Sequence, residues 1–427
     1  MKLLVVGGGG REHAIIKKLR ENPEVKTVYA LPGNGGISED AICVPGIGAK
    51  NIDGIVEFAT AHKIDFAVVA PDDPLAMGCV DRLHAAGIPC FGPEAKAARI
   101  ESSKVFAKNL MKKYGIPTAD YRTFRKAAEA REYLKNASYP IVIKADGLAL
   151  GKGVLIVEDY GEAVDAVRSI MEEKIFGSAG KEIVIEEYLT GPEVTVLAFT
   201  DGVTIRPMIS SMDHKRVGDG DTGLNTGGMG TIAPNPYYTE KIEKICMERI
   251  FLPTLAAMRE EGCPFKGCLY FGLMITEDGP KVIEYNCRFG DPEAQVVLPL
   301  LQTDLLTIMR AVEARKLGEI DVRWSDESAA CVILASGGYP GSYETGKVIS
   351  FRAPLPGNVT CYHAGDRKEQ WELVTNGGRV LGLTATAPSL RGAIEDAYKA
   401  ADTVQFAGKY CRRDIGQRAL RALEMHE

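Results

Sequence analysis

Residues 2–12 read KLLVVGGGGRE, an apolar run that enters four consecutive glycines and continues into a helical stretch. Outward from this segment, the apolar runs 27–31 and 65–70 are typical of further strands, and residues 11–20 and 75–86 are typical of helices. Strands that alternate with helices form a parallel sheet with helices on its faces. The first hundred residues therefore predict a doubly wound α/β domain.

The glycine loop is a candidate phosphate site. Glycines let the backbone approach a phosphate, and a helix N-terminus offers unpaired N–H groups and positive potential. The loop does not fit a dinucleotide fingerprint, because Glu12 takes the third glycine position and the strand ending at 29–33 has no carboxylate for a ribose. An NAD enzyme is therefore disfavoured, and a tight turn without a ligand is the alternative.

Bulk composition limits the classes of function. With 427 residues, 45% of them hydrophobic and 25% charged, the chain is long enough for several domains and has the composition of a soluble protein. No apolar run reaches the length of a membrane span, and the start lacks the apolar core of a secretory signal, so we expect a cytoplasmic protein. The net charge of −6 disfavours duplex nucleic acid as a partner, and ten cysteines without a C-x-x-C pair predict neither zinc nor disulfides.

The pattern changes after the first domain. A helical stretch over 93–114 is broken at 115–117, which predicts a domain boundary in this region. Beyond it, hairpin turns are predicted at 201–202 and 277–279. We expect strands over 141–145, 154–157, 182–187, 194–200, 203–210, 268–276 and 280–287, helices over 162–173 and 239–261, and a strand-rich region from 325 with a last helix beyond 389.

A lysine at a strand end and the glycine loop that follows it form a second candidate site. Lys144 lies near the end of the run 141–145, and the loop 146–153 carries Lys152 toward the next strand. Such a loop can fold over a triphosphate while Lys144 contacts it as a point charge. The spacing is not that of a P-loop, and solvated lysines beside an ordinary turn are an equal alternative.

A third candidate is the run 183–189, which reaches Glu186 and Glu187. Its backbone could hydrogen-bond the edge of an adenine ring, and one of the carboxylates could hydrogen-bond a ribose hydroxyl. Charges on an edge strand are the more common explanation of such a pattern.

A fourth candidate is a pair of polar residues on an apolar strand. Glu284 and Asn286 lie two apart and point the same way, which gives the oxygen pair that Mg²⁺ takes beside nucleotide phosphates. Arg288 continues this face and can bind a carboxylate or a phosphate. Buried side chains bonded to nearby backbone are the alternative, but polar groups on an apolar strand need a reason, so a metal is favoured.

The fifth candidate is the polar stretch 213–230. Eighteen residues of this composition are difficult to bury, and they contain both charge signs and clustered glycines. Long loops in compact domains tend to be functional or disordered. We therefore expect an active-site loop.

Five stretches together carry a resemblance that covers nearly the whole chain. They are 7–13, 32–34, 144–153, 213–230 and 284–292, with continuations at 337–341, 363–365 and 375–380. In this combination the chain resembles the phosphoribosylamine-glycine ligases, also called glycinamide ribonucleotide synthetases, which are ATP-grasp enzymes.

The resemblance implies that ATP, glycine and 5-phosphoribosylamine are converted to ADP, phosphate and glycinamide ribonucleotide through a glycyl phosphate, the second step of de novo purine biosynthesis. It implies a Rossmann-like domain over 1–103, a central ATP-grasp domain over 104–325 with a mobile small subdomain at about 119–190, and a C-terminal strand-rich domain over 326–427. The cofactors would be ATP and Mg²⁺ or Mn²⁺. The protein would be a monomer or a homodimer, without nucleic acid or membrane partners.

The resemblance also assigns candidate residues. ATP would be held by Lys104, Lys144, Gly147, Gly151, Lys152, Gly153, Glu186, Glu187, Tyr188, Leu189 and Glu193. Phosphoribosylamine and glycine would be held by Gly8, Gly9, Gly10, Pro32, Gly33, Asn34, Asp213, Thr226, Gly227, Gly228, Met229 and Arg288. The metal would be held by Glu284 and Asn286, and the catalytic residues would be Lys144, Asp213, Lys215 and Arg288.

The sequence departs from the family pattern at two places. Asp73 stands where the family more often has glutamate in a shorter acidic pattern, and the strand at 270–275 offers no second metal carboxylate. The general base stays open between Asp213 and His214. A related ATP-grasp ligase or carboxylase on another substrate is the nearer alternative, and a nucleotide-binding regulator without catalysis is the more distant one.

Overall fold

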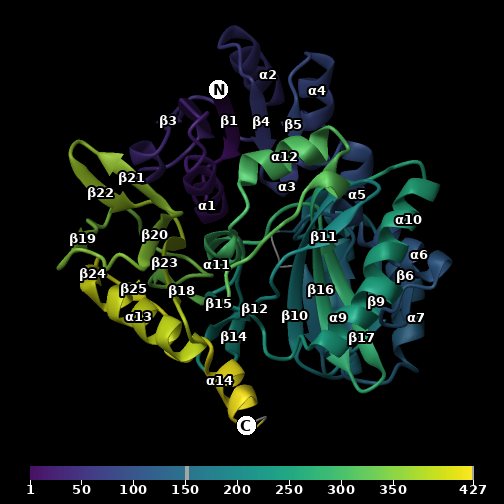
Figure 1. Cartoon of the computed structure of the whole chain (residues 1–427). Coiled ribbons are helices and arrows are strands. Elements are labelled where there is room, and N and C mark those ends of the chain that lie inside the picture. Colours follow the sequence, from purple (N-terminus) through teal and green to yellow (C-terminus); the bar gives the residue numbers. More distant parts are fainter. Residues whose placement is uncertain (150–152, 426–427) are drawn as a thin grey trace.

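The computed structural model describes residues 1–149 and 153–425. Its first part is a parallel sheet, made of β1 (Lys2–Gly7), β2 (Thr27–Pro32), β3 (Ile42–Cys43), β4 (Phe66–Val69) and β5 (Cys90–Phe91), with helices α1 (Gly10–Leu19), α2 (Ile52–Ala61), α3 (Asp72–Ala76) and α4 (Cys79–Ala85). The strand order β3-β2-β1-β4-β5 confirms the doubly wound domain, which lies at the top of Figure 1. Leu3 and Val5 pack with α1, and Leu4 and Val6 pack with α2, because alternate side chains of a strand point to opposite faces.

The single helix expected over 75–86 is wrong. α3 and α4 are separated at Gly78, whose φ of +83° is left-handed, and glycine takes this conformation without a steric cost. The stretch 93–114 is likewise divided, into α5 (Ala95–Ser102) and α6 (Lys104–Tyr114). The Oγ of Ser103 caps α6 by accepting a hydrogen bond from the Phe106 N–H at 3.1 Å.

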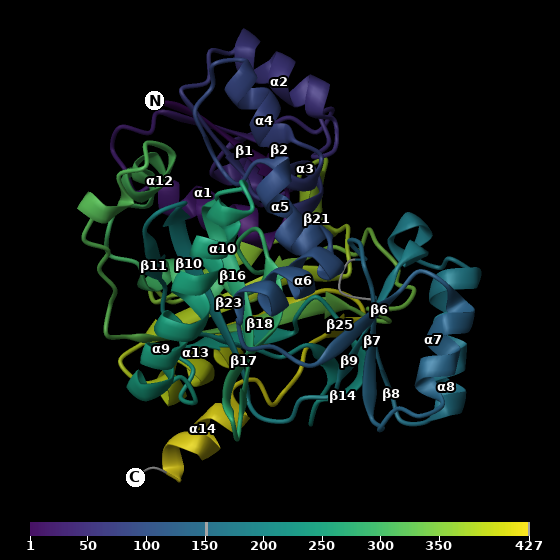
Figure 2. The same ribbon diagram turned by 90° about the vertical axis from the view of Figure 1, so that its right-hand side faces the viewer.

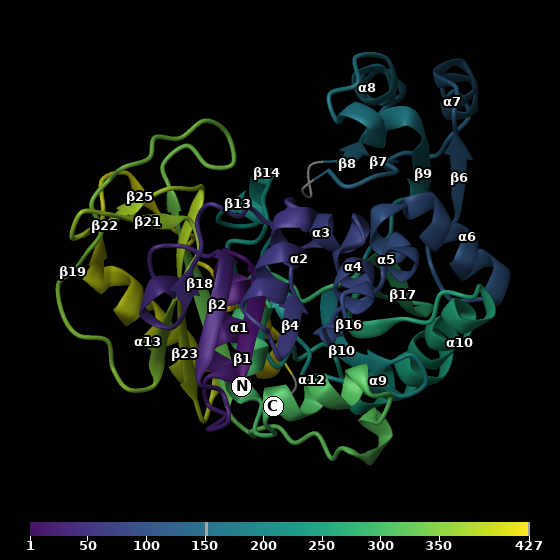
Figure 3. The ribbon, with the colours of Figure 1, turned by 90° about the horizontal axis from the view of Figure 1, so that it is seen from above.

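Residues 121–187 form a separate small lobe. Its antiparallel sheet has the order β6-β9-β7-β8, with β6 (Tyr121–Phe124), β7 (Ile141–Ala145), β8 (Val154–Val157) and β9 (Ile183–Glu187), and it carries α7 (Ala127–Leu134) and α8 (Tyr160–Val167), which continues as a π-helical turn (Arg168–Glu172). Ile143, Ile185 and Val167 belong to a core cluster confined to this lobe. Figures 2 and 3 show the lobe projecting from the rest of the molecule. The strands expected at 141–145 and 154–157 are confirmed.

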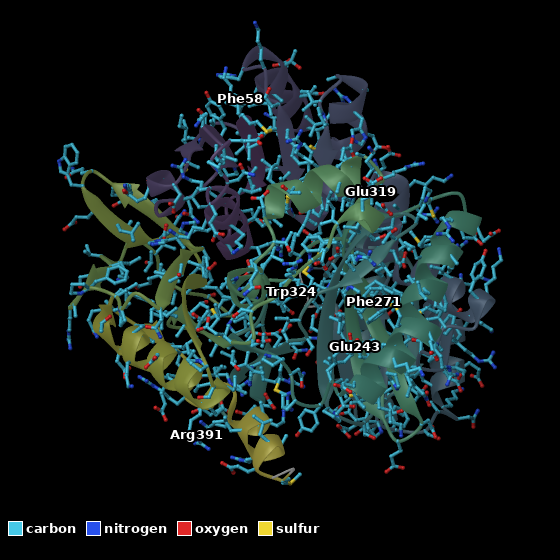
Figure 4. All side chains as sticks on the ribbon, viewed as in Figure 1. Phe58, Glu243, Phe271, Glu319, Trp324 and Arg391 are labelled. Atoms are coloured by element: carbon cyan, nitrogen blue, oxygen red, sulfur yellow. The ribbon has the colours of Figure 1, made fainter. Side chains whose placement is uncertain are left out.

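A second antiparallel sheet forms the large lobe. Its order is β11-β10-β16-β17, with β10 (Glu193–Asp201), β11 (Ile205–Pro207), β16 (Lys266–Thr276) and β17 (Gly279–Asn286), and the long helix beside it comprises α9 (Glu240–Cys246), a π-helical turn (Met247–Phe251) and α10 (Leu252–Glu260). Both predicted hairpins are confirmed, because β10 pairs with β11 and β16 pairs with β17. Phe271, labelled in Figure 4, packs on Phe251 of the long helix with ring centroids 4.4 Å apart. The other face of the sheet, including Phe199 and Tyr270, packs with α12 (Leu305–Glu313).

The C-terminal part is a further antiparallel sheet. Its order is β12-β15-β18-β23-β20, with β12 (Met212–Asp213), β15 (Gly230–Ala233), β18 (Ser328–Ser336), β20 (Val359–His363), β23 (Arg379–Ala387) and β25 (Lys409–Tyr410), which pairs with β18. Helix α13 (Leu390–Thr403) covers it, and the remaining elements are α11 (Ala294–Val297), β19 (Ser350–Phe351), β21 (Asp366–Glu369), β22 (Glu372–Thr375), β24 (Val404–Gln405) and α14 (Gln417–Glu424). Figure 1 shows this sheet and α13 on the side opposite the large lobe. No helix in the described ranges is long and apolar enough to cross a membrane.

The stretch 213–230, expected to be an active-site loop, contains short strands. β13 (Arg216–Gly218) and β14 (Thr222–Asn225) form a hairpin within it, and its ends, β12 and β15, belong to the C-terminal sheet. Gly230 pairs with Val332, so the hydrogen-bond partners lie about a hundred residues further along the chain. Local composition does not reveal such distant pairing.

Candidate active site

The N-terminal glycine loop lies against the segment 32–34. A Cβ at Gly8 would lie 2.3 Å from the carbonyl oxygen of Gly33, so only glycine fits this approach. The amide of Asn34 donates to the carbonyl of Gly8 at 3.0 Å. Three residues expected to bind the phosphoribosyl substrate are therefore adjacent.

The N-terminus of α1 is partly occupied by protein carboxylates. The Gly9 N–H donates to Glu12 Oε2 at 2.5 Å, and the Arg11 N–H donates to Asp291 Oδ2 at 3.2 Å. Two of the N–H groups at this helix N-terminus are therefore already bonded to carboxylates. The Gly8 and Gly10 N–H groups donate to no acceptor within residues 1–149 and 153–425, so a smaller anion site is left.

Arg379 links the C-terminal sheet to this loop. Its Nη1 donates to the carbonyls of Asp291 at 2.7 Å and Gly227 at 2.9 Å, and lies 3.5 Å from the Asp291 carboxylate. Arg379 was missed as a site residue, although the stretch 375–380 carried part of the resemblance.

Lys215 joins two candidate carboxylates from the large lobe. Its Nζ lies 3.4 Å from Glu193 Oε2 and 3.4 Å from Glu284 Oε1. The three side chains are 33–44% exposed, so a ligand can reach them. Burial opposes ionisation of Glu284, but Lys215 and Lys144 outweigh it and hold the pKa of this carboxyl below its usual value.

Asp213 lies beside the turn 226–229. A Cβ at Gly228 would lie 2.6 Å from Asp213 Oδ1, and Oδ1 accepts a hydrogen bond from the His214 N–H at 2.7 Å. Burial raises the pKa of Asp213 well above its usual value, and the nearby carboxylate of Glu293 raises it further. Glu293 is a second residue that the sequence did not single out. Met229, expected at the substrate, is fully buried in the core.

His214 is held by bonds to the backbone on both sides of its ring. Its Nδ1 lies 3.0 Å from the carbonyl of Gly230, and its Nε2 accepts a hydrogen bond from the Gly416 N–H at 3.1 Å. Burial lowers the pKa of this imidazole to about 4. Of the two candidate bases, Asp213 is therefore the one that keeps acceptor capacity.

Lys144 and Glu186 form a buried pair between the lobes. Lys144 Nζ donates to Glu186 Oε2 at 3.0 Å and to the carbonyl of Ile283 on β17 at 3.0 Å. Lys108, which the sequence did not single out, lies 3.7 Å from the same carboxylate, and burial lowers its pKa to about 8.

Lys104 lies near the Lys144–Glu186 pair. Its Nζ donates to the carbonyl of Gly147 at 3.0 Å, and Asp146 accepts hydrogen bonds from Ser103 Oγ at 3.0 Å and the Val105 N–H at 2.8 Å. The loop after β7 is thus fastened to the N-terminus of α6.

The other residues expected at the nucleotide lie at the edge of this group. Glu187 points away from Glu186, pairs with Lys281 at 3.6 Å and accepts from the Asp120 N–H, and Tyr188 is 42% exposed. The Gly153 carbonyl accepts from the Ala145 N–H at 2.9 Å. Gly151 and Lys152 lie outside the described residues.

Arg288 and Asn286 both contact Glu101 of α5. Arg288 Nη2 donates to Glu101 Oε1 at 2.9 Å, and its buried Nε has no partner in the described part of the chain. One end of the Asn286 amide lies 3.0 Å from Glu101 Oε1 and 3.0 Å from the carbonyl of Tyr285, and because both groups are acceptors, that end is assigned as the nitrogen.

Glu284 and Asn286 supply one carboxylate and one amide oxygen. Two hard oxygen donors fit a Mg²⁺ ion that takes most of its ligands from nucleotide phosphates. The neighbouring strand places Tyr270 opposite Asn286, and no group of three His, Cys, Asp or Glu side chains within 1–149 and 153–425 forms a complete protein cage.

Two cavities of about 430 and 410 Å³ lie elsewhere, along α1. Both are lined by Lys17, Asp40 and Thr360, and neither is lined by the residues expected to bind ATP or metal.

Two antiparallel lobes, one carrying Lys144 and Glu186 and the other carrying Glu193 and Glu284, define an ATP-grasp protein. Residues 1–101, 102–294 and 329–418 match the N domain, the ATP-grasp (A) domain and the C domain of phosphoribosylglycinamide synthetase. The chain therefore belongs to the phosphoribosylglycinamide synthetase family.

Individual relatives agree with this assignment. The phosphoribosylamine-glycine ligase of Caldanaerobacter subterraneus is 46% identical over 97% of this chain and 99% of its own length. The bifunctional purine biosynthetic protein PUR2,5 of Pichia angusta is 46% identical over 99% of this chain, which spans 54% of that protein. The crystal structure of the phosphoribosylamine-glycine ligase of Thermotoga maritima is 36% identical, with a TM-score of 0.84 over 97% of this chain and 100% of that chain.

Proposed function

We propose that the protein joins glycine to 5-phosphoribosylamine through a glycyl phosphate, with cleavage of ATP to ADP and phosphate, giving glycinamide ribonucleotide in de novo purine biosynthesis. The full-length relatives are named for this reaction. The observation that carries the proposal in this chain is the pairing of Lys144 with Glu186 on the small lobe and of Lys215 with Glu193 and Glu284 on the large lobe, where Lys144 also bonds the backbone of β17.

The nucleotide phosphates would lie beside Lys104 and Lys144. Burial lowers the pKa of Lys104, and the like charge of Lys144 lowers it further. A triphosphate would relieve this repulsion, because it brings negative charge between two desolvated cations. Adenine would lie at the end of β9, over residues 186–189, and the ribose would contact Glu193.

Glycine would bind through its carboxylate at Arg288. The Nε of this side chain is buried and donates to no acceptor within residues 1–149 and 153–425, so its N–H is left to bind a carboxylate by a charge-assisted hydrogen bond. A carboxylate held there would attack the γ-phosphorus to give glycyl phosphate. Lys144 and Arg288 would neutralise the charge that develops on the transferred group.

Phosphoribosylamine would lie between the glycine loop and Asp213. The free N–H groups of Gly8 and Gly10 suit its phosphate. Asp213 would accept the proton of the amine as nitrogen attacks the acyl phosphate and phosphate leaves, and burial, which raises the pKa of Asp213, makes its carboxylate a stronger base. Closure of the small lobe would exclude the water that hydrolyses acyl phosphates.

Mg²⁺ or Mn²⁺ held by Glu284 and Asn286 would supply positive charge at the phosphate oxygens. Both protein ligands come from β17, so the strand fixes their spacing.

The test is ADP release with each substrate omitted in turn. We expect release only when ATP, glycine, phosphoribosylamine and the divalent ion are all present, together with glycinamide ribonucleotide as product. A ligase or carboxylase on another acid would release ADP with that acid in place of glycine. A regulator would bind ATP and release no ADP in any mixture.

A further inference from the structure

The carboxylate of Glu101 receives hydrogen bonds from three consecutive residues at the end of β17. Oε2 accepts from the Cys287 N–H at 2.7 Å. Oε1 accepts from Arg288 Nη2 at 2.9 Å and lies 3.0 Å from one end of the Asn286 side-chain amide. Glu101 is 8% exposed and comes from α5, nearly two hundred residues earlier.

These bonds determine which atom of the Asn286 amide faces Glu101. An amide has one donor side and one acceptor side, and an oxygen placed against the carboxylate would repel it. The nitrogen therefore points to Glu101, and the amide oxygen is left for the side that a cation can reach. An oxygen donor oriented in this way is what a hard divalent ion requires.

The same carboxylate orients Arg288. Because Nη2 is held by Glu101 and Nη1 donates to the Phe289 carbonyl at 3.3 Å, the rotation of the guanidinium is fixed and its Nε stays free. One carboxylate thus controls two groups with different proposed ligands.

We propose that Glu101 is a positioning residue that holds the Asn286 oxygen toward the divalent ion and the Arg288 Nε toward the glycine carboxylate. The inference rests on the proposed function. It extends that function by a residue that touches neither ligand and acts through its neighbours.

The first test replaces Glu101 by glutamine. Glutamine has nearly the same shape but only one acceptor oxygen, so it cannot accept from Cys287 on one side and from Asn286 and Arg288 on the other. Mn²⁺ binding is measured by electron paramagnetic resonance in the presence of ADP, without turnover, and KM for glycine is measured separately. Loss of the carboxylate that hydrogen-bonds a metal ligand predicts about 10- to 100-fold weaker Mn²⁺ binding. KM for glycine should rise more than kcat falls.

Asp201→Asn is the matched control. Asp201 is also buried, at 2% exposure, and accepts the N–H groups of Val203, Thr204 and Leu317, but it contacts none of residues 286–288. Its loss should lower stability and leave the Mn²⁺ and glycine constants unchanged. Equal effects of Glu101→Gln and Asp201→Asn on these constants would overturn the inference.

A second test uses Asn286→Asp. Aspartate is a good magnesium ligand, but here it would place a carboxylate against Glu101, so Mn²⁺ binding should weaken despite the added charge. Adding Glu101→Gln should restore at least about tenfold of the loss, because the amide of glutamine can donate to the new carboxylate. A double variant whose loss equals the product of the single losses would refute the coupling. If the unaltered protein with ADP binds no Mn²⁺, the metal assignment in the proposed function falls and this inference falls with it.

Discussion

Lys144 and Lys108 share one carboxylate, Glu186, at 3.0 and 3.7 Å. All three residues are buried, at 8%, 3% and 3% exposure. Two ammonium groups beside one carboxylate leave net positive charge in a desolvated place, which is costly unless an anion arrives. At the residue scale, this imbalance marks a phosphate site more clearly than the glycine-bearing loop does.

Lys144→Ala should lower kcat by about 10²- to 10³-fold, by analogy with the loss of one preorganised charge-stabilising donor. The fold should be retained because Lys108 still neutralises Glu186. Steady-state ADP release gives the measurement. Lys135→Ala, which removes a lysine that is 53% exposed and paired with Glu132, should leave kcat unchanged. Near-normal turnover of Lys144→Ala would contradict the assignment.

Sequence reasoning found candidate residues that carry a local signal and missed those whose role depends on distant partners. Lys144 stands out as a lysine at a strand end before a glycine loop, and Glu284 and Asn286 stand out as polar residues on an apolar strand. Glu101 and Arg379 carry no such signal: Glu101 lies in a helix, and its partner Arg288 is 187 residues away. Only the folded chain brings them together.

At the scale of elements, the elements predicted well were those specified by nearby residues. Both hairpins and the strands beside Lys144 were identified from turn residues and apolar runs. The helix expected over 75–86 is interrupted at Gly78. The strands within 213–230 were not predicted, because β15 pairs with β18 about a hundred residues further along the chain and β12 pairs with β15. The boundaries at 103 and 325 stay a prediction, and β12 and β15 already belong to the C-terminal sheet.

The contact between the glycine loop and the segment 32–34 can be tested by Gly8→Ala. The new Cβ would lie 2.3 Å from the Gly33 carbonyl oxygen, so the two backbones must separate. We expect about 1–3 kcal/mol of destabilisation in urea unfolding and a higher KM for phosphoribosylamine. Gly46→Ala, where no atom lies within 4 Å of the new Cβ, is the control. Equal stability and equal KM in both variants would show that the contact has no effect.

At the scale of the whole molecule, two histidines connect the N-terminal sheet domain to the C-terminal sheet. His13 Nδ1 accepts from the His363 N–H at 2.8 Å, and its Nε2 donates to Asp40 at 2.9 Å. His363 Nδ1 donates to Asp366 Oδ2 at 2.5 Å, and Asp366 Oδ1 accepts from the Gly36 N–H at 3.0 Å. The segment that supports the glycine loop is thus held by the C-terminal domain.

The two histidines respond to pH in opposite directions. Burial lowers the pKa of His13 to about 4, so this group costs stability as pH falls from about 6.5 toward 4. Burial also opposes protonation of His363, but the hydrogen bond to Asp366 outweighs it and raises the pKa of His363 to about 10. The stability contributed by His363 is therefore complete below a pH of about 6.5 and is lost as pH rises toward 10.

His363→Asn should remove this alkaline dependence while keeping a donor for Asp366. The unaltered protein binds one more proton when folded than when unfolded between about pH 7 and 9, so its free energy of unfolding falls there by up to about 1.4 kcal/mol per pH unit relative to the variant. Urea midpoints at constant ionic strength and several pH values give the difference. Titratable groups that do not interact with His363 are the same in both proteins and cancel from it. His13→Gln should instead flatten the acid limb between about pH 6.5 and 4. Parallel pH curves for the unaltered protein and His363→Asn would mean that Asp366 does not hold the proton on His363, and the two domains would then be joined by hydrogen bonds alone.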